Sequence, residues 1–64
     1  MINKDIINYY NHGYELSSDD QEFPKWFETY QEKVACLLGF NDFTIGIYRT
    51  EEEIIKEINK IFGN

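Results

Sequence analysis

The most regular pattern of apolar side chains lies in the middle of the chain and predicts an amphipathic helix over Lys25–Leu38. Six apolar residues recur there at the spacing of one helix face: Trp26, Phe27, Tyr30, Val34, Leu37 and Leu38. Pro24 suits the first turn, because the N–H that proline lacks has no intrahelical partner at that position. Gly39 follows the last apolar residue and predicts the end of the helix, with Phe40 packing back against it.

A second helix is predicted over Glu51–Phe62. Thr50 and Glu53 have the T-x-x-E spacing of a capping box, in which each side chain accepts a backbone N–H at the helix start. The apolar face of this helix consists of Ile54, Ile55, Ile58, Ile61 and Phe62. We expect this face to share one core with Trp26 and Tyr30 of the preceding helix.

The remaining segments predict one further helix and two short strands. Asn3 to about Asn11 has apolar residues at helical spacing, and Gly13 is expected to end that helix. Tyr14–Ser17 and Phe43–Arg49 alternate apolar and polar residues, as half-buried strands do. The sequence therefore predicts an α+β fold, a single compact domain over residues 1–64 with the element order α-β-α-β-α.

The strand predicted over Phe43–Arg49 needs a partner, because backbone N–H and C=O groups must be paired. Tyr14–Ser17 is the other strand-like segment, and two short strands form a marginal sheet. Three arrangements remain open: pairing with Tyr14–Ser17, pairing with a second copy of the chain, or shielding of the edge by helices. A homodimer is therefore one expectation for this sequence.

The size and cysteine content limit the fold and its chemistry. A core built from 64 residues seldom supplies more than about 3–5 kcal/mol without a staple. Cys36 is the only cysteine, so no internal disulfide forms, and one cysteine with one histidine cannot hold a structural zinc ion. We expect no metal and no cofactor. A lone thiol, the lack of a secretory signal and the lack of a membrane-spanning apolar run favour the cytoplasm.

The sequence shows no catalytic arrangement, so we expect a protein that is not an enzyme. His12 precedes a predicted helix end, where a histidine favours the helix dipole. Cys36 borders the apolar face of the middle helix and is interpreted as a small buried hydrophobic residue. A dyad of these two residues is sterically conceivable, but no motif supports it.

The charge of the chain points to a protein partner. With 12 acidic and 6 basic residues, the net charge of −6 argues against direct binding of nucleic acid, whose phosphates are held by clustered lysine and arginine. An acidic surface is instead attracted to basic protein surfaces, including grooves that hold nucleic acid. The Glu51–Glu53 triplet has a simpler explanation, because carboxylates stabilise the first turn of a helix.

The candidate partner-binding residues are acidic side chains and tyrosines. They are Asp19, Asp20, Glu22, Glu28, Glu32, Tyr9 and Tyr10. On the predicted middle helix, Glu28 and Glu32 form an i,i+4 pair of like charges, which costs stability and so suggests selection for binding. A merely solvated face is the alternative. Tyr9 and Tyr10 are adjacent, so one of them is expected at the surface, where tyrosines are enriched in interfaces.

Together these features predict a small acidic inhibitor or modulator that docks on the basic surface of a larger protein. In size and charge the chain resembles small acidic proteins that occupy nucleic-acid grooves, among them anti-CRISPR and anti-restriction proteins of phage and mobile elements. That resemblance is compositional and assigns no role to any residue. The alternative is an accessory subunit or homo-oligomer held together by apolar contacts and a strand edge.

Overall fold

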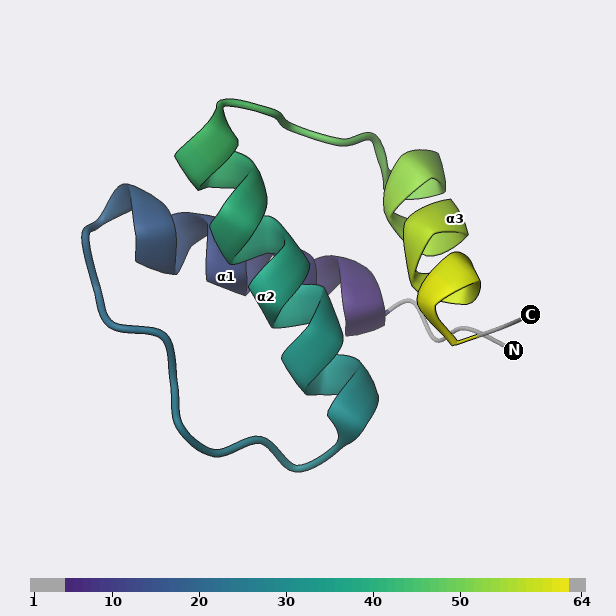
Figure 1. The fold of residues 1–64 in the computed structure, drawn as a ribbon, viewed down its shortest axis with the longest axis horizontal. Coiled ribbons are helices and arrows are strands. Elements are labelled where there is room, and N and C mark those ends of the chain that lie inside the picture. The colour runs from purple at the N-terminus through teal and green to yellow at the C-terminus, as the bar shows by residue number, and fades with distance from the viewer. Residues whose placement is uncertain (1–4, 63–64) are drawn as a thin grey trace.

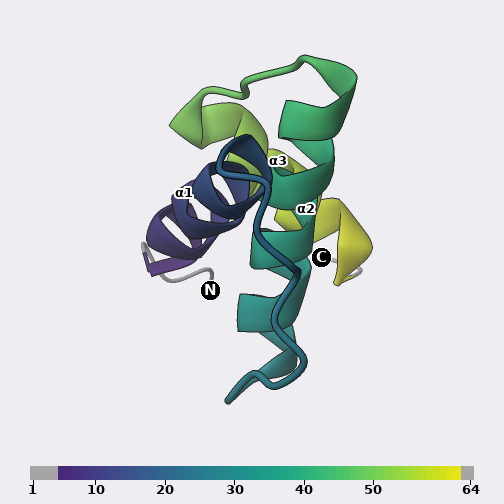
Figure 2. The same ribbon diagram turned by 90° about the vertical axis from the view of Figure 1, so that its left-hand side faces the viewer.

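The computed structural model describes residues 5–62, which form three helices (Figure 1). These are α1 (Asp5–Ser18), α2 (Tyr30–Ile45) and α3 (Glu51–Ile61). α2 crosses α1, and α3 lies on the other side of the molecule from the long α1–α2 connection (Figures 1 and 2). Within residues 5–62, no helix is long and apolar enough to cross a membrane.

The predicted α+β fold is wrong, because the described part of the chain contains no strand. Tyr14–Ser17 continues α1, and the first three residues of Phe43–Arg49 form the last turn of α2. The alternating residues Phe43, Ile45 and Ile47 are 39%, 64% and 43% exposed, so their alternation marks no buried sheet face. Over so few residues a period of two is not distinct from part of a helical repeat. A strand edge is therefore no route to a homodimer.

Gly13 and Gly39 lie inside helices instead of ending them. Both are buried where α1 and α2 cross. A Cβ atom on Gly13 would lie 1.9 Å from the carbonyl oxygen of Cys36, and one on Gly39 would lie 2.0 Å from the carbonyl oxygen of Tyr10. The two backbones therefore meet with no room for a side chain. These glycines serve close helix packing, and each helix continues through its glycine.

The ends of α2 are set by other residues than those predicted. Thr29 caps the N-terminus by accepting the N–H of Glu32 at 3.1 Å. The C-terminus has the Schellman pattern: Gly46, at φ 80°, donates its N–H to the Phe43 carbonyl at 3.1 Å, and Ile47 donates to the Asp42 carbonyl at 2.8 Å. The helix thus begins five residues later and ends seven residues later than the predicted Lys25–Leu38.

The core lies among all three helices. Its buried side chains are Ile6, Tyr10, Ala35, Ile54 and Ile58, and those partly buried around them are Ile7, Tyr9, Tyr14, Val34, Leu38 and Phe62. Ile54 and Ile58 thus face the core, as predicted. Trp26 and Tyr30 do not, because they are 78% and 67% exposed. Trp26 precedes α2, so the helical spacing that placed it on the apolar face does not apply to it.

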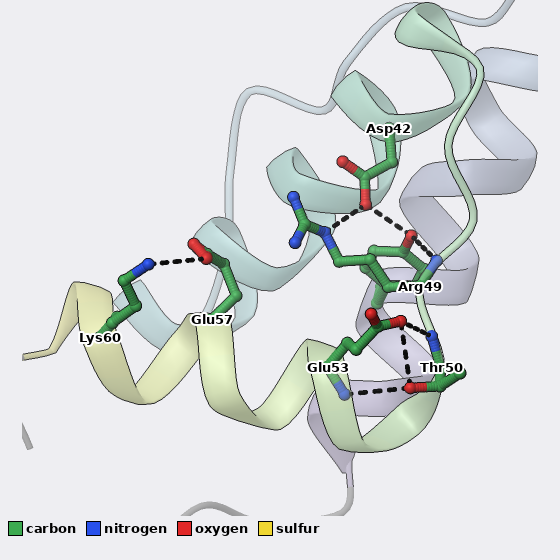
Figure 3. A network of polar contacts seen from close by, with 7 residues as sticks. Asp42, Arg49, Thr50, Glu53, Glu57 and Lys60 are labelled. Carbon is green, nitrogen blue, oxygen red and sulfur yellow. Dashed lines mark hydrogen bonds and ion pairs between the residues drawn. The ribbon is translucent and has the colours of Figure 1, made fainter.

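The capping box of α3 confirms the sequence-based expectation. The Thr50 hydroxyl accepts the N–H of Glu53 at 3.2 Å, and the Glu53 carboxylate accepts the N–H of Thr50 at 2.9 Å (Figure 3). These two contacts are close in sequence and need no tertiary partner. For this reason a four-residue motif predicted them.

The capping box gives a pH prediction for α3. Hydrogen bonds from the backbone and side chain of Thr50 lower the pKa of Glu53 in the folded protein. A group with a lowered folded pKa stabilises the fold above its unfolded pKa, about 4.3 for glutamate, and this contribution is lost as the pH falls through the folded pKa. We expect Thr50→Ala to raise the Glu53 pKa in a carboxyl NMR titration. An unchanged midpoint would show that the box does not hold the carboxylate.

Candidate functional site

The α1–α2 connection, residues 19–29, is an irregular segment that is attached to both helices. Its start continues the end of α1, where the Asp19 N–H donates to the Glu15 carbonyl at 2.8 Å. In its middle, the ring of Phe23 packs on those of Phe27 and Phe40, each with a centroid distance of 5.4 Å. These contacts hold the connection against α2, while its polar side chains face solvent.

The connection carries four of the five acidic residues that were predicted from the sequence to bind a partner. Asp19, Asp20, Glu22 and Glu28 are all exposed, and Lys25 is the one basic residue among them. Within residues 5–62 the ion pairs are Arg49–Asp42 and Lys60–Glu57, so neither neutralises a carboxylate of the connection. Residues 19–29 therefore present a negative surface to solvent.

The structure corrects the reason for selecting Glu28 and Glu32. Glu28 precedes α2, so the two residues are not an i,i+4 pair on one helix face. The Glu32 carboxylate instead accepts the N–H of Glu28 at 3.0 Å and so satisfies a backbone donor ahead of α2. The supposed cost of like charges is therefore replaced by a local stabilising contact. A role for either residue in binding stays a prediction.

A cleft lies between the connection and the two helices it joins. It has a volume of ≈ 190 Å³, and its lining residues are Tyr9, His12, Pro24, Trp26, Phe27, Glu32 and Cys36. Tyr9 and His12 come from α1, Glu32 and Cys36 from α2, and the rest from the connection. The cleft thus brings Tyr9 and Glu32, two of the predicted binding residues, to one place, with the exposed ring of Trp26 beside them.

Burial and nearby carboxylates raise the pKa values of two residues that line the cleft. Burial raises the pKa of the Tyr9 hydroxyl, and the charges of Glu32, Asp5 and Glu28 raise it further. Burial also raises the pKa of the Cys36 thiol, with a smaller effect of Glu32. A raised thiol pKa leaves little of the nucleophilic thiolate, so Cys36 acts as part of the wall.

His12 and Cys36, the two residues of the conceivable dyad, both line the cleft. No hydrogen bond joins the two side chains in the part of the chain that the structure describes. His12 is exposed in the middle of α1, not at a helix end as the sequence suggested. Among residues 5–62, no three histidine, cysteine or acidic side chains lie together as ligands for a metal ion.

Tyr10 was selected as a binding residue, but the structure places it at the centre of the core. It is 0% exposed, and its hydroxyl donates to Asp42 Oδ2 at 2.6 Å. Arg49 Nε donates to the same oxygen at 2.8 Å, and the Arg49 backbone N–H donates to the Tyr10 hydroxyl at 3.2 Å (Figure 3). This network ties the α2–α3 connection to α1 and α2, so Tyr10 is not available to a partner.

Asp42 is not among the functional residues predicted from the sequence. It is 1% exposed, and its position three residues after Gly39 puts it on the buried face of α2. Arg49, the only arginine of the chain, lies seven positions later, but no local pattern in the sequence links it to Asp42. Burial and the bond to Asp42 raise the pKa of the Tyr10 hydroxyl, so this group stays protonated and donates.

Comparison with known proteins gives no match to a protein-family model, to a curated protein or to a solved structure.

Proposed function

We propose that this protein is a non-catalytic binding protein that docks on the basic surface of a larger protein through residues 19–29 and the adjoining cleft. The observation that carries the proposal is Trp26, which is 78% exposed on a connection that also carries four exposed carboxylates and one lysine. Tryptophan is the residue type most enriched in interface hot spots, and an exposed ring of this size gains much from burial against a partner. The carboxylates supply the charge complementarity that steers the encounter.

The size of the molecule is compatible with such an interface. A specific complex buries about 800 Å² on each partner. The accessible surface is 4717 Å², so one face would use about a sixth of it. Basic protein surfaces are typical of proteins that bind nucleic acid. The biological role we propose is therefore that of an inhibitor or modulator of such a protein.

Affinity capture from the source cells at graded ionic strength tests this function. We expect the captured protein to have a basic surface, and its binding to weaken steeply as salt rises. Trp26→Ala should weaken binding by about 2 kcal/mol, the range of a hot-spot residue. The combined change Asp19→Asn, Asp20→Asn and Glu22→Gln should lower the association rate and flatten the salt dependence.

The matched control changes two acidic residues elsewhere. Glu51→Gln with Glu52→Gln removes two negative charges, against three in the connection variant, from the first turn of α3 on the far side of the molecule, and should leave binding unchanged. Equal binding by the parent and the Asp19/Asp20/Glu22 variant at low salt would refute acidic docking through the connection.

A second candidate function is self-assembly through apolar contacts. Phe43, Ile45, Ile47 and Tyr48 are 39–64% exposed and cluster at the end of α2 and just after it. Contiguous apolar surface of this kind is typical of interfaces. Sedimentation at increasing protein concentration distinguishes the two functions, since apolar assembly persists at high salt, whereas acidic docking weakens.

A further inference from the structure

The cleft beside the connection has the composition of a cation-binding cage, and this property goes beyond a generally acidic surface. We infer that it receives one arginine side chain of the basic partner, stacked among Tyr9, Trp26 and Phe27 and paired with Glu32. The inference rests on the proposed function and names the group that the site recognises. It follows from the lining, the charge and the size of the cleft.

The aromatic lining comes from two separate segments. Tyr9 lies on α1, and Trp26 and Phe27 lie on the connection. Phe27 is held by the ring of Phe23, at a centroid distance of 5.4 Å. Aromatic faces carry negative charge density and attract cations, arginine more often than lysine. A planar guanidinium also stacks on these faces, which an ammonium group does not do.

The charge of the cleft selects a cation. Glu32 is the one acidic lining residue, and its Oε1 accepts the N–H of Glu28 at 3.0 Å. A carboxylate offers about four lone-pair sites, so Glu32 retains capacity for a guanidinium. His12 is the one basic residue that lines the cleft; Lys25 and Lys33 line a neighbouring depression, which shares Trp26 and Phe27 with it. The negative surroundings that raise the pKa of Tyr9 act in the same direction.

The size of the cleft limits the ligand to a single side chain. Its ≈ 190 Å³ is below the roughly 300–1,000 Å³ of sites that enclose a cofactor or a drug-sized molecule. A guanidinium on a flexible stem enters such an opening from a flat protein surface. The exposed side of Trp26 is then covered by the backbone around the bound arginine.

Intrinsic fluorescence tests the inference, because Trp26 is the only tryptophan of the chain. The probes are N-acetylarginine methylamide and N-acetylcitrulline methylamide, its neutral near-isostere. We expect a saturable change with the arginine probe in the millimolar range, and binding at least about tenfold weaker with citrulline, since the ion pair and the cation–π attraction are lost. Glu32→Gln keeps the oxygen that caps Glu28 and should weaken arginine binding about three- to tenfold.

Glu52→Gln is the matched control, with the same change of charge on α3 and an expected affinity equal to that of the parent. Equal binding of arginine and citrulline would overturn the inference and leave an apolar cleft. Tighter binding of tetramethylammonium than of arginine would overturn the assignment of arginine in favour of a quaternary amine. Either result leaves the salt-dependent capture experiment intact, so failure of the cage and failure of acidic docking are distinguishable.

Discussion

Gly39→Ala is expected to remove most of the folding free energy of the protein. A Cβ atom at this position would lie 2.0 Å from the carbonyl oxygen and 2.9 Å from the carbonyl carbon of Tyr10. These are backbone atoms of α1, so relief requires the two helices to move apart along their whole contact. Overpacking of a tight site costs typically 1–3 kcal/mol and sometimes more; we expect about 3 kcal/mol or more here. A domain of this size has only about 3–5 kcal/mol to lose.

Urea denaturation followed by far-UV circular dichroism measures this loss. Gly13→Ala should behave alike, because its Cβ atom would lie 1.9 Å from the carbonyl oxygen of Cys36. Gly46→Ala is the control: no atom lies within 4 Å of its Cβ position, but φ is +80°. Only the left-handed conformation is then penalised, at about 1 kcal/mol. A Gly39→Ala variant as stable as Gly46→Ala would show that the helices do not cross as closely as described.

Asp42→Ala is expected to destabilise the fold by about 3 kcal/mol, the second largest effect. It removes the shared acceptor of Tyr10 and Arg49 from a site that is 1% exposed. Removing one partner from a buried ion pair costs about 3–5 kcal/mol. The Arg49 side chain is 27% exposed and regains some water, so the lower end of this range applies. The midpoint of thermal or urea unfolding measures the change.

A double-mutant cycle separates the two bonds of Asp42. Tyr10→Phe should cost about 1.5–3 kcal/mol, the range for a hydrogen bond to a charged group. In the Asp42→Ala background the same change should cost much less, because the acceptor is already absent. Asp19→Ala, on the exposed connection, is the control with little expected effect. Additive effects of Tyr10→Phe and Asp42→Ala would contradict a shared network.

The sequence by itself determined the features that depend on neighbours along the chain. The capping box of Thr50 and Glu53 and the inward face of Ile54 and Ile58 were predicted correctly, because a helix start and a 3.6-residue period are local properties. The excess of carboxylates over residues 19–32 was equally legible, and the structure leaves most of these residues exposed. Trp26 was misread, because its spacing matched a helix that begins only at Tyr30.

The tertiary structure alone decided the features that depend on which backbone lies opposite. A glycine that follows an apolar helix face can end the helix, or it can let a second helix pack closely against the first. Gly13 and Gly39 have the second role, because each faces a carbonyl group of the crossing helix. The same crossing buries Tyr10 beside Asp42, 32 residues apart in sequence. The cleft of Tyr9, Trp26 and Glu32 likewise joins three segments. Pairings at such separations leave no periodic signal along the chain, because only the packing of α1 against α2 brings the partners together.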